Sequence, residues 1–111
     1  MSKLALLYNG ELVSQHKLRP DIVFIGRGGD CQIQIDHPDI GSRHAVIRRY
    51  AKQLVITPLS AQNPVRLNGE PIKQATELNR GDRIELGQHA LVVNPRPWQL
   101  PASGAVDAEK I

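Results

Sequence analysis

Short runs of aliphatic and β-branched residues alternate with polar residues along most of this chain, and turn-forming residues interrupt them at close intervals. In residues 31–35, for example, Ile33 and Ile35 alternate with Gln32 and Gln34, which is the period of a strand with one buried face. The chain shows no segment with the 3.6-residue period of an amphipathic helix. The pattern therefore predicts an all-β fold.

Two Asn-Gly pairs, Asn9-Gly10 and Asn68-Gly69, each separate two such runs and predict tight hairpins, because both residues tolerate the positive φ that these turns require. The predicted strands are residues 3–8, 11–15, 21–26, 31–35, 44–50, 53–58, 65–67, 70–72, 83–86 and 89–94. Residues 73–78 are expected to form a connection without a strand. About ten to eleven short strands at this spacing predict a sandwich of two antiparallel sheets.

The length of 111 residues suits one hydrophobic core. We expect residues 1–94 to form the β-sandwich domain and residues 95–111, which begin with a proline-rich stretch, to form a flexible tail. Trp98 in this segment is interpreted as packing against the edge of the sandwich, and an exposed contact for a partner is the alternative.

The composition excludes several classes of protein. The net charge of +3 is mild, so charge alone gives little support to nucleic-acid binding. The apolar start of the chain is interrupted at Asn9-Gly10 before a signal peptide or membrane span is complete, and we expect a cytoplasmic protein. The single cysteine, Cys31, is interpreted as a buried apolar residue, and the scattered histidines predict no metal site.

A glycine-rich loop, Gly26-Arg27-Gly28-Gly29, follows the third predicted strand and places the five N–H donors of Arg27 at the mouth of a loop. Further along the chain come Ser42-Arg43-His44, then Asn63, then Asn68-Gly69. This spacing resembles the pattern of the forkhead-associated (FHA) domain over about residues 22–93. The resemblance implies a β-sandwich that recognises phosphorylated peptides with loops at one end.

The resemblance also assigns roles to single residues, but only two of the family's five loop positions, Arg27 and Asn63, match its pattern cleanly. Gln62 stands where the family often has Thr or Ser, and Pro64-Val65 replaces Gly-Thr. Gly41 stands where the family has a serine whose hydroxyl accompanies the arginine on the phosphate. Losing one hydrogen bond to a charged group costs about 1.5–3 kcal/mol, so we expect weakened phosphothreonine recognition unless a neighbour such as Ser42 takes over. The implied phosphopeptide-binding residues are Arg27, Gly41, Ser42, Arg43 and Asn63, and the implied supporting residues are Gly26, His44, Asn68 and Gly69.

These observations predict a protein-interaction module that needs no cofactor and binds a partner protein in trans. If the module recognises phosphate, we expect the partner to be phosphorylated on threonine by a Ser/Thr kinase. A scaffold or assembly subunit that binds without phosphate is the main alternative. A basic β module that binds nucleic acid is a weaker one, because aromatic stacking residues are few. The basic residues that such a module would use are Arg48, Arg49, Lys52 and Arg66. An enzyme is not expected, since no acid, base or nucleophile cluster is evident.

Overall fold

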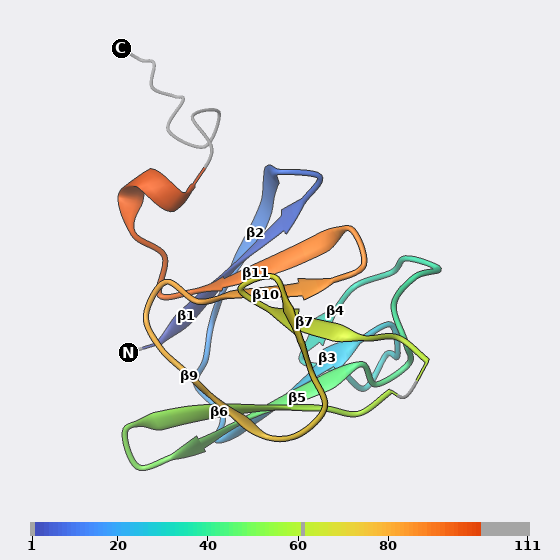
Figure 1. The fold of residues 1–111 in the computed structure, drawn as a ribbon, viewed down its shortest axis with the longest axis horizontal. Helices are drawn as coiled ribbons and strands as arrows, with labels where there is room; N and C mark the ends of the chain where they lie inside the picture. The colour runs from blue at the N-terminus through green and yellow to red at the C-terminus, as the bar shows by residue number, and fades with distance from the viewer. Residues whose placement is uncertain (1, 61, 101–111) are drawn as a thin grey trace.

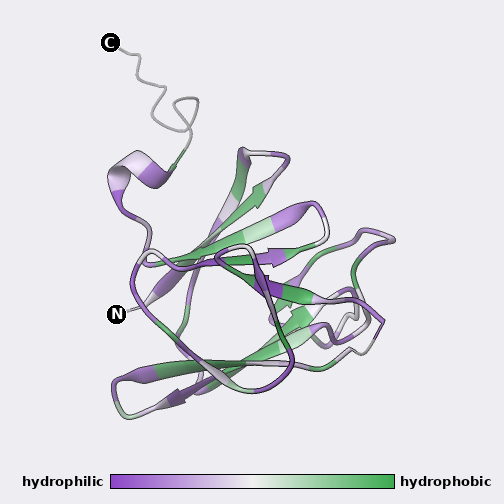
Figure 2. Cartoon of the chain, viewed as in Figure 1, coloured by the Kyte–Doolittle hydropathy of each residue, from purple (hydrophilic) through white to green (hydrophobic). Residues whose placement is uncertain are grey.

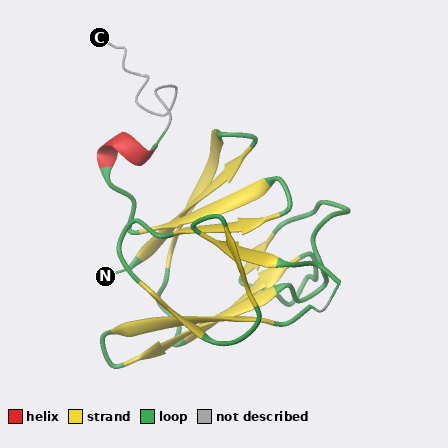
Figure 3. Cartoon of the chain, viewed as in Figure 1, coloured by secondary structure: helices red, strands yellow, loops and turns green. Residues whose placement is uncertain are grey.

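The computed structural model describes residues 2–60 and 62–100, and these residues form two facing β-sheets (Figure 1). The six-stranded sheet has the order β2-β1-β11-β10-β7-β8, and the five-stranded sheet has the order β4-β3-β5-β6-β9. The helical content of the described residues is one short 3-10 turn at Pro97–Gln99, drawn in red in Figure 3. The prediction of an all-β sandwich is confirmed. The strands are β1 (Lys3–Tyr8), β2 (Glu11–Lys17), β3 (Ile22–Gly26), β4 (Ile33–Gln34), β5 (Ala45–Tyr50), β6 (Gln53–Pro58), β7 (Val65–Leu67), β8 (Glu70–Ile72), β9 (Thr76–Leu78), β10 (Arg83–Leu86) and β11 (His89–Val93).

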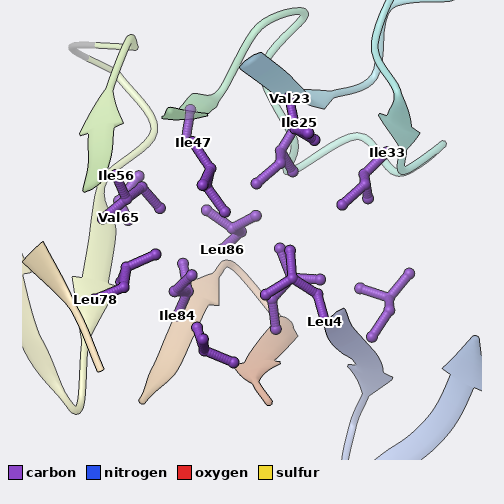
Figure 4. Packing of buried hydrophobic residues seen from close by; sticks show 14 of the residues in the cluster. Leu4, Val23, Ile25, Ile33, Ile47, Ile56, Val65, Leu78, Ile84 and Leu86 are labelled. Atoms are coloured by element: carbon purple, nitrogen blue, oxygen red, sulfur yellow. The ribbon is translucent and has the colours of Figure 1, made fainter. Parts of the chain in front are cut away.

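The core lies between the two sheets and is built from the inward-facing residues of each strand. Figure 4 shows side chains of the two sheets pointing toward one another, among them Ile47 and Ile56 from one sheet and Leu86 from the other. These three side chains are almost fully buried. Hydrophobic residues follow the strands and hydrophilic residues gather in the turns (Figure 2). Burial of this aliphatic surface is what holds the sheets together.

The hairpins predicted from the Asn-Gly pairs are present. Asn9 and Asn68 have φ of 51° and 53°, and the glycines that follow them have φ of 85° and 90°. Each pair joins two antiparallel neighbours, β1 with β2 and β7 with β8. The positive φ at both turn positions matches the right-handed twist of the flanking strands.

Two strand predictions need correction. Residues 73–78 are not a plain connection, because Thr76–Leu78 forms β9 at the edge of the smaller sheet, where Leu78 pairs with Leu54. The hydrophobic pattern did not predict this strand, because only Leu78 of its three residues is buried. A strand this short depends on pairing with its neighbour. The strand expected over residues 31–35 shortens to β4, which pairs with β3 in parallel and so makes one exception to the antiparallel arrangement.

The segment after β11 also differs from expectation. Trp98 is 77% exposed, so the interpretation that it packs against the sandwich edge is wrong. The side chain of Gln99 attaches the segment instead, because its Nε2 donates to the carbonyl of Gly81 at 2.9 Å and its Oε1 accepts from the N–H of Arg96 at 2.9 Å. Most of the tail expected to be flexible, residues 101–111, lies outside the described residues. No helix in the described part of the chain is long and apolar enough to cross a membrane.

Candidate functional site

Two loops that follow β3 and β4 are joined by backbone hydrogen bonds at one end of the sandwich, on the side of Figure 1 away from the C-terminal segment. The N–H of Arg27 donates to the carbonyl of Gly41 at 2.9 Å, and the N–H of Gly28 donates to the carbonyl of Ser42 at 3.0 Å. Gly26 permits this approach, because a Cβ on it would lie 2.4 Å from the Ser42 carbonyl oxygen. Glycine at 26 therefore allows the two loops to meet, while the Arg27 side chain stays exposed.

His44 connects this pair of loops to a third loop, between β6 and β7. Its side chain is 1% exposed, and its Nδ1 accepts the N–H of Gly41 at 3.1 Å. Nε2 therefore carries the ring proton and faces the carbonyl of Pro64 at 3.4 Å. Burial lowers the pKa of His44, which keeps the imidazole neutral and leaves Nδ1 free to accept. The structural role expected of His44 agrees with this geometry.

Asn63 lies beside Gly41 at the meeting point of the loops. A Cβ on Gly41 would lie 3.2 Å from Asn63 Nδ2 and 3.5 Å from Ser60 Oγ, so the absent side chain leaves room for both. Ser60 Oγ accepts the backbone N–H of Asn63 at 3.1 Å and its Nδ2–H at 3.0 Å. These bonds hold the carboxamide of Asn63 against Gly41.

Arg43 points to a different neighbour. Its guanidinium pairs with the carboxylate of Asp30, with Nε 3.1 Å from Oδ2, and lies 4.7 Å from the ring centroid of Phe24. The hydrogen bond from Arg43 lowers the pKa of Asp30 and the same pair raises the pKa of Arg43. Of the two arginines that the sequence predicted for this site, Arg27 and Arg43, the second is thus paired with Asp30.

The structure brings together six of the residues singled out in the sequence, which are Gly26, Arg27, Gly41, Ser42, His44 and Asn63. The Asn68-Gly69 turn does not support this site, which corrects the role expected for it. Asn68 Nδ2 donates to Asp82 at 3.0 Å and Asn68 Oδ1 accepts the N–H of Arg83 at 2.9 Å, because β7 carries the chain away from the three loops.

A groove of about 630 Å³ opens beside Asn63. Charged residues of both signs line it, Asp39 and Glu85 carrying carboxylates and Arg66 a guanidinium. Neither Ser60 nor this groove belonged to the site expected from the sequence. The signal for Ser60 was local, since a serine three residues before Asn63 can bond the Asn63 backbone across a loop. The groove had no such signal, because its residues come from several loops and from strands of the larger sheet that are far apart in the sequence.

The family assignment follows from this geometry and a direct comparison. The family model described as the FHA domain matches residues 23–87, which include the three loops and His44. The chain belongs to the FHA domain family. FHA domains are phosphopeptide-binding interaction modules, recognition folds rather than catalytic ones.

Two curated proteins match parts of the chain at modest sequence identity. The chain is 32% identical over 79 residues to the oxoglutarate dehydrogenase inhibitor of Corynebacterium jeikeium, covering 71% of this chain and 54% of that protein. It is 37% identical over 65 residues to the transcriptional regulatory protein EmbR of Mycobacterium tuberculosis, covering 59% of this chain and 17% of EmbR. The chain thus spans about half or less of these curated relatives.

Two solved structures are similar to the whole sandwich. EmbR in complex with a low-affinity phosphopeptide superposes with a TM-score of 0.75 at 29% identity, covering 83% of this chain and 24% of that one. An FHA domain from a study of phosphothreonine-dependent FHA domain interactions superposes with a TM-score of 0.75 at 28% identity, covering 87% of this chain and 99% of that one. The match to a complete solved domain shows that the sandwich is a full FHA fold.

Proposed function

We propose that this FHA domain binds a phosphothreonine-containing segment of a partner protein in trans, through the loops that carry Arg27, Gly41 and Asn63. The guanidinium of Arg27 supplies charged donors to the phosphate, and the carboxamide of Asn63 holds the peptide backbone. Ser42 and Arg43 border the same loops and complete the set of residues proposed to contact the peptide. The partner is a protein phosphorylated by a Ser/Thr kinase, and the domain acts as an interaction module and not as an enzyme.

The observation that carries this proposal is the pair of contacts that Gly41 makes. Its carbonyl accepts the Arg27 N–H at 2.9 Å, and its Cα faces Asn63 and Ser60. The backbone of Arg27 and the carboxamide of Asn63, from loops far apart in the sequence, therefore meet at one glycine, next to the buried ring of His44. Several converging donors on a rigid frame are what a phosphate dianion requires.

The nucleic-acid alternative finds less support in the arrangement of its basic residues. Arg48 lies on the outer face of the smaller sheet, and Arg66 lies on the outer face of the larger one. Arg49 is half-buried, and its guanidinium donates to the carbonyl of Leu18. These cations face different directions and do not form one basic surface. Phosphate-independent protein binding is the alternative that the experiment must distinguish from phosphopeptide binding.

The test is a fluorescence-anisotropy titration with a degenerate phosphothreonine peptide pool and its unphosphorylated twin. The phosphorylated pool is expected to bind more tightly, and Arg27→Ala is expected to weaken it about 100-fold or more, because a guanidinium–phosphate pair makes two charged hydrogen bonds. Arg80→Ala is the matched control, since it removes the same charge from an exposed turn beside Pro95 and Pro97. Equal binding of the two pools would reject the proposal and favour a phosphate-independent scaffold.

A further inference from the structure

Ser60 has a hydroxyl whose acceptor capacity is already used. Its Oγ lies 3.1 Å from the backbone nitrogen of Asn63 and 3.0 Å from Asn63 Nδ2, and both of those groups are donors. A serine hydroxyl has two lone pairs and one proton. With both lone pairs accepting, any further hydrogen bond that Ser60 makes must be a donation. A phosphate oxygen, which only accepts, is a suitable partner.

This hydroxyl lies beside the gap left at Gly41. A Cβ on Gly41 would lie 3.5 Å from both Oγ and Cβ of Ser60, so the two positions are in van der Waals range. The carbonyl of Gly41 accepts the N–H of Arg27. A group that approaches Gly41 beside Asn63 therefore comes within reach of the Ser60 proton. Ser60 is half-buried, and its loop is held at Leu59, whose N–H donates to the carbonyl of His44 at 3.0 Å.

We propose that Ser60 donates its hydroxyl to the phosphate of the bound peptide and supplies, from the loop between β6 and β7, the hydroxyl that position 41 lacks. This proposal rests on the proposed function and names a further phosphate-binding residue of the same site. Gly41 leaves the space beside Asn63 and Ser60 open, because a Cβ at 41 would lie 3.2 Å from Asn63 Nδ2 and 3.5 Å from Ser60 Oγ. Phosphate recognition in this chain then needs no movement of Ser42.

Ser60 also orients Asn63, so the experiment must separate donation to phosphate from positioning of the amide. Four variants serve this purpose: Ser60→Ala, Asn63→Ala, the double variant Ser60→Ala/Asn63→Ala, and Gly41→Ser/Ser60→Ala. In the Asn63→Ala background the backbone N–H of residue 63 still bonds Ser60 Oγ, so the hydroxyl keeps its place. Ser14→Ala on β2 is the matched control, because it removes a part-buried serine hydroxyl that bonds His16 outside the site.

Binding of the degenerate phosphothreonine pool and of its unphosphorylated twin is measured by NMR titration, which follows weak complexes and shows that each variant is folded. Ser60→Ala is expected to weaken the phosphorylated pool about 10- to 100-fold, the cost of one hydrogen bond to a charged group, and to leave the unphosphorylated pool unchanged. A similar loss is expected when Ser60→Ala is added to Asn63→Ala. Gly41→Ser/Ser60→Ala is expected to recover part of the lost affinity, since it returns a hydroxyl to the same space.

Three results would overturn the inference while leaving the proposed function in place. These are unchanged phosphopeptide binding in Ser60→Ala, a loss that disappears in the Asn63→Ala background, and a folded Gly41→Ser/Ser60→Ala variant that binds no better than Ser60→Ala. The second result would make Ser60 a positioning residue for Asn63 only. A wild-type domain that binds both pools equally would reject the proposed function, and this inference with it.

Discussion

Replacing Gly26 with alanine should push the loop after β3 and the loop between β4 and β5 apart. A Cβ at this position would lie 2.4 Å from the carbonyl oxygen of Ser42 and 2.9 Å from that of Gly41. Both contacts are with backbone atoms, so no side chain can rotate away to relieve them. The loop between β4 and β5 must move, and the hydrogen bonds from Arg27 and Gly28 to these two carbonyls must lengthen or break.

The cost can be estimated from those contacts. Overpacking a well-packed site costs about 1–3 kcal/mol. Each lost backbone hydrogen bond adds a net cost of about 1 kcal/mol. The free energy of unfolding should therefore fall by about 2–4 kcal/mol in Gly26→Ala. This sum is smaller than the two costs added in full, because the overpacking cost already includes part of the cost of the lost hydrogen bonds. Because small domains have only about 5–15 kcal/mol of stability, this is a large loss for one methyl group.

Urea unfolding followed by far-UV circular dichroism measures the effect, since the exposed Trp98 is a poor reporter of the core. A loss of this size lowers the urea midpoint by about 1–2 M at the m-value of a small domain. Gly29→Ala is the matched control in the same loop, because a Cβ there has no atom within 4 Å and its φ is not in the left-handed region. It should be neutral or stabilising by about 0.4–1 kcal/mol. Equal midpoints for the two variants would refute the close approach of the loops.

Two further effects concern the titration of buried histidines and the Asp30–Arg43 ion pair. Burial lowers the pKa of both His44 and His89, so the unfolded chain binds more protons than the folded one between the lowered values and the ordinary value near 6.5. Stability should therefore be complete above about pH 6.5 and fall below it, by at most about 1.4 kcal/mol per pH unit for each group, as measured by urea unfolding at a series of pH values. His44→Gln should show a shallower decline, and an identical decline would show that His44 does not titrate in this window. Asp30→Asn should leave the thermal midpoint unchanged at physiological salt, because Asp30 and Arg43 are 56% and 55% exposed and solvent screens their pairing. A clear drop in the midpoint would show that this ion pair stabilises the fold.

The strands and hairpins of this protein could be predicted from its sequence because their causes are local. Alternation of Ile33 and Ile35 with polar residues, and the positive φ that Asn68-Gly69 tolerates, depend on residues that are neighbours in the chain. β9 escaped prediction because its pairing with β6, and not its own pattern, makes it a strand. The exposure of Trp98 could not be predicted, because the polar side chain of Gln99, and not the indole, attaches the last described segment to the sandwich.

The candidate site was only partly predictable. The family pattern singled out Arg27, Gly41 and Asn63, but which neighbour each of them meets depends on hydrogen bonds between loops. Local sequence alone does not reveal that Ser60 lies against the gap at Gly41, or that Arg43 turns to Asp30. The sequence by itself determined a two-sheet frame with a glycine-rich loop at one end. Tertiary structure decided which donors converge there, because residues far apart in the chain are brought together only when the sheets pack.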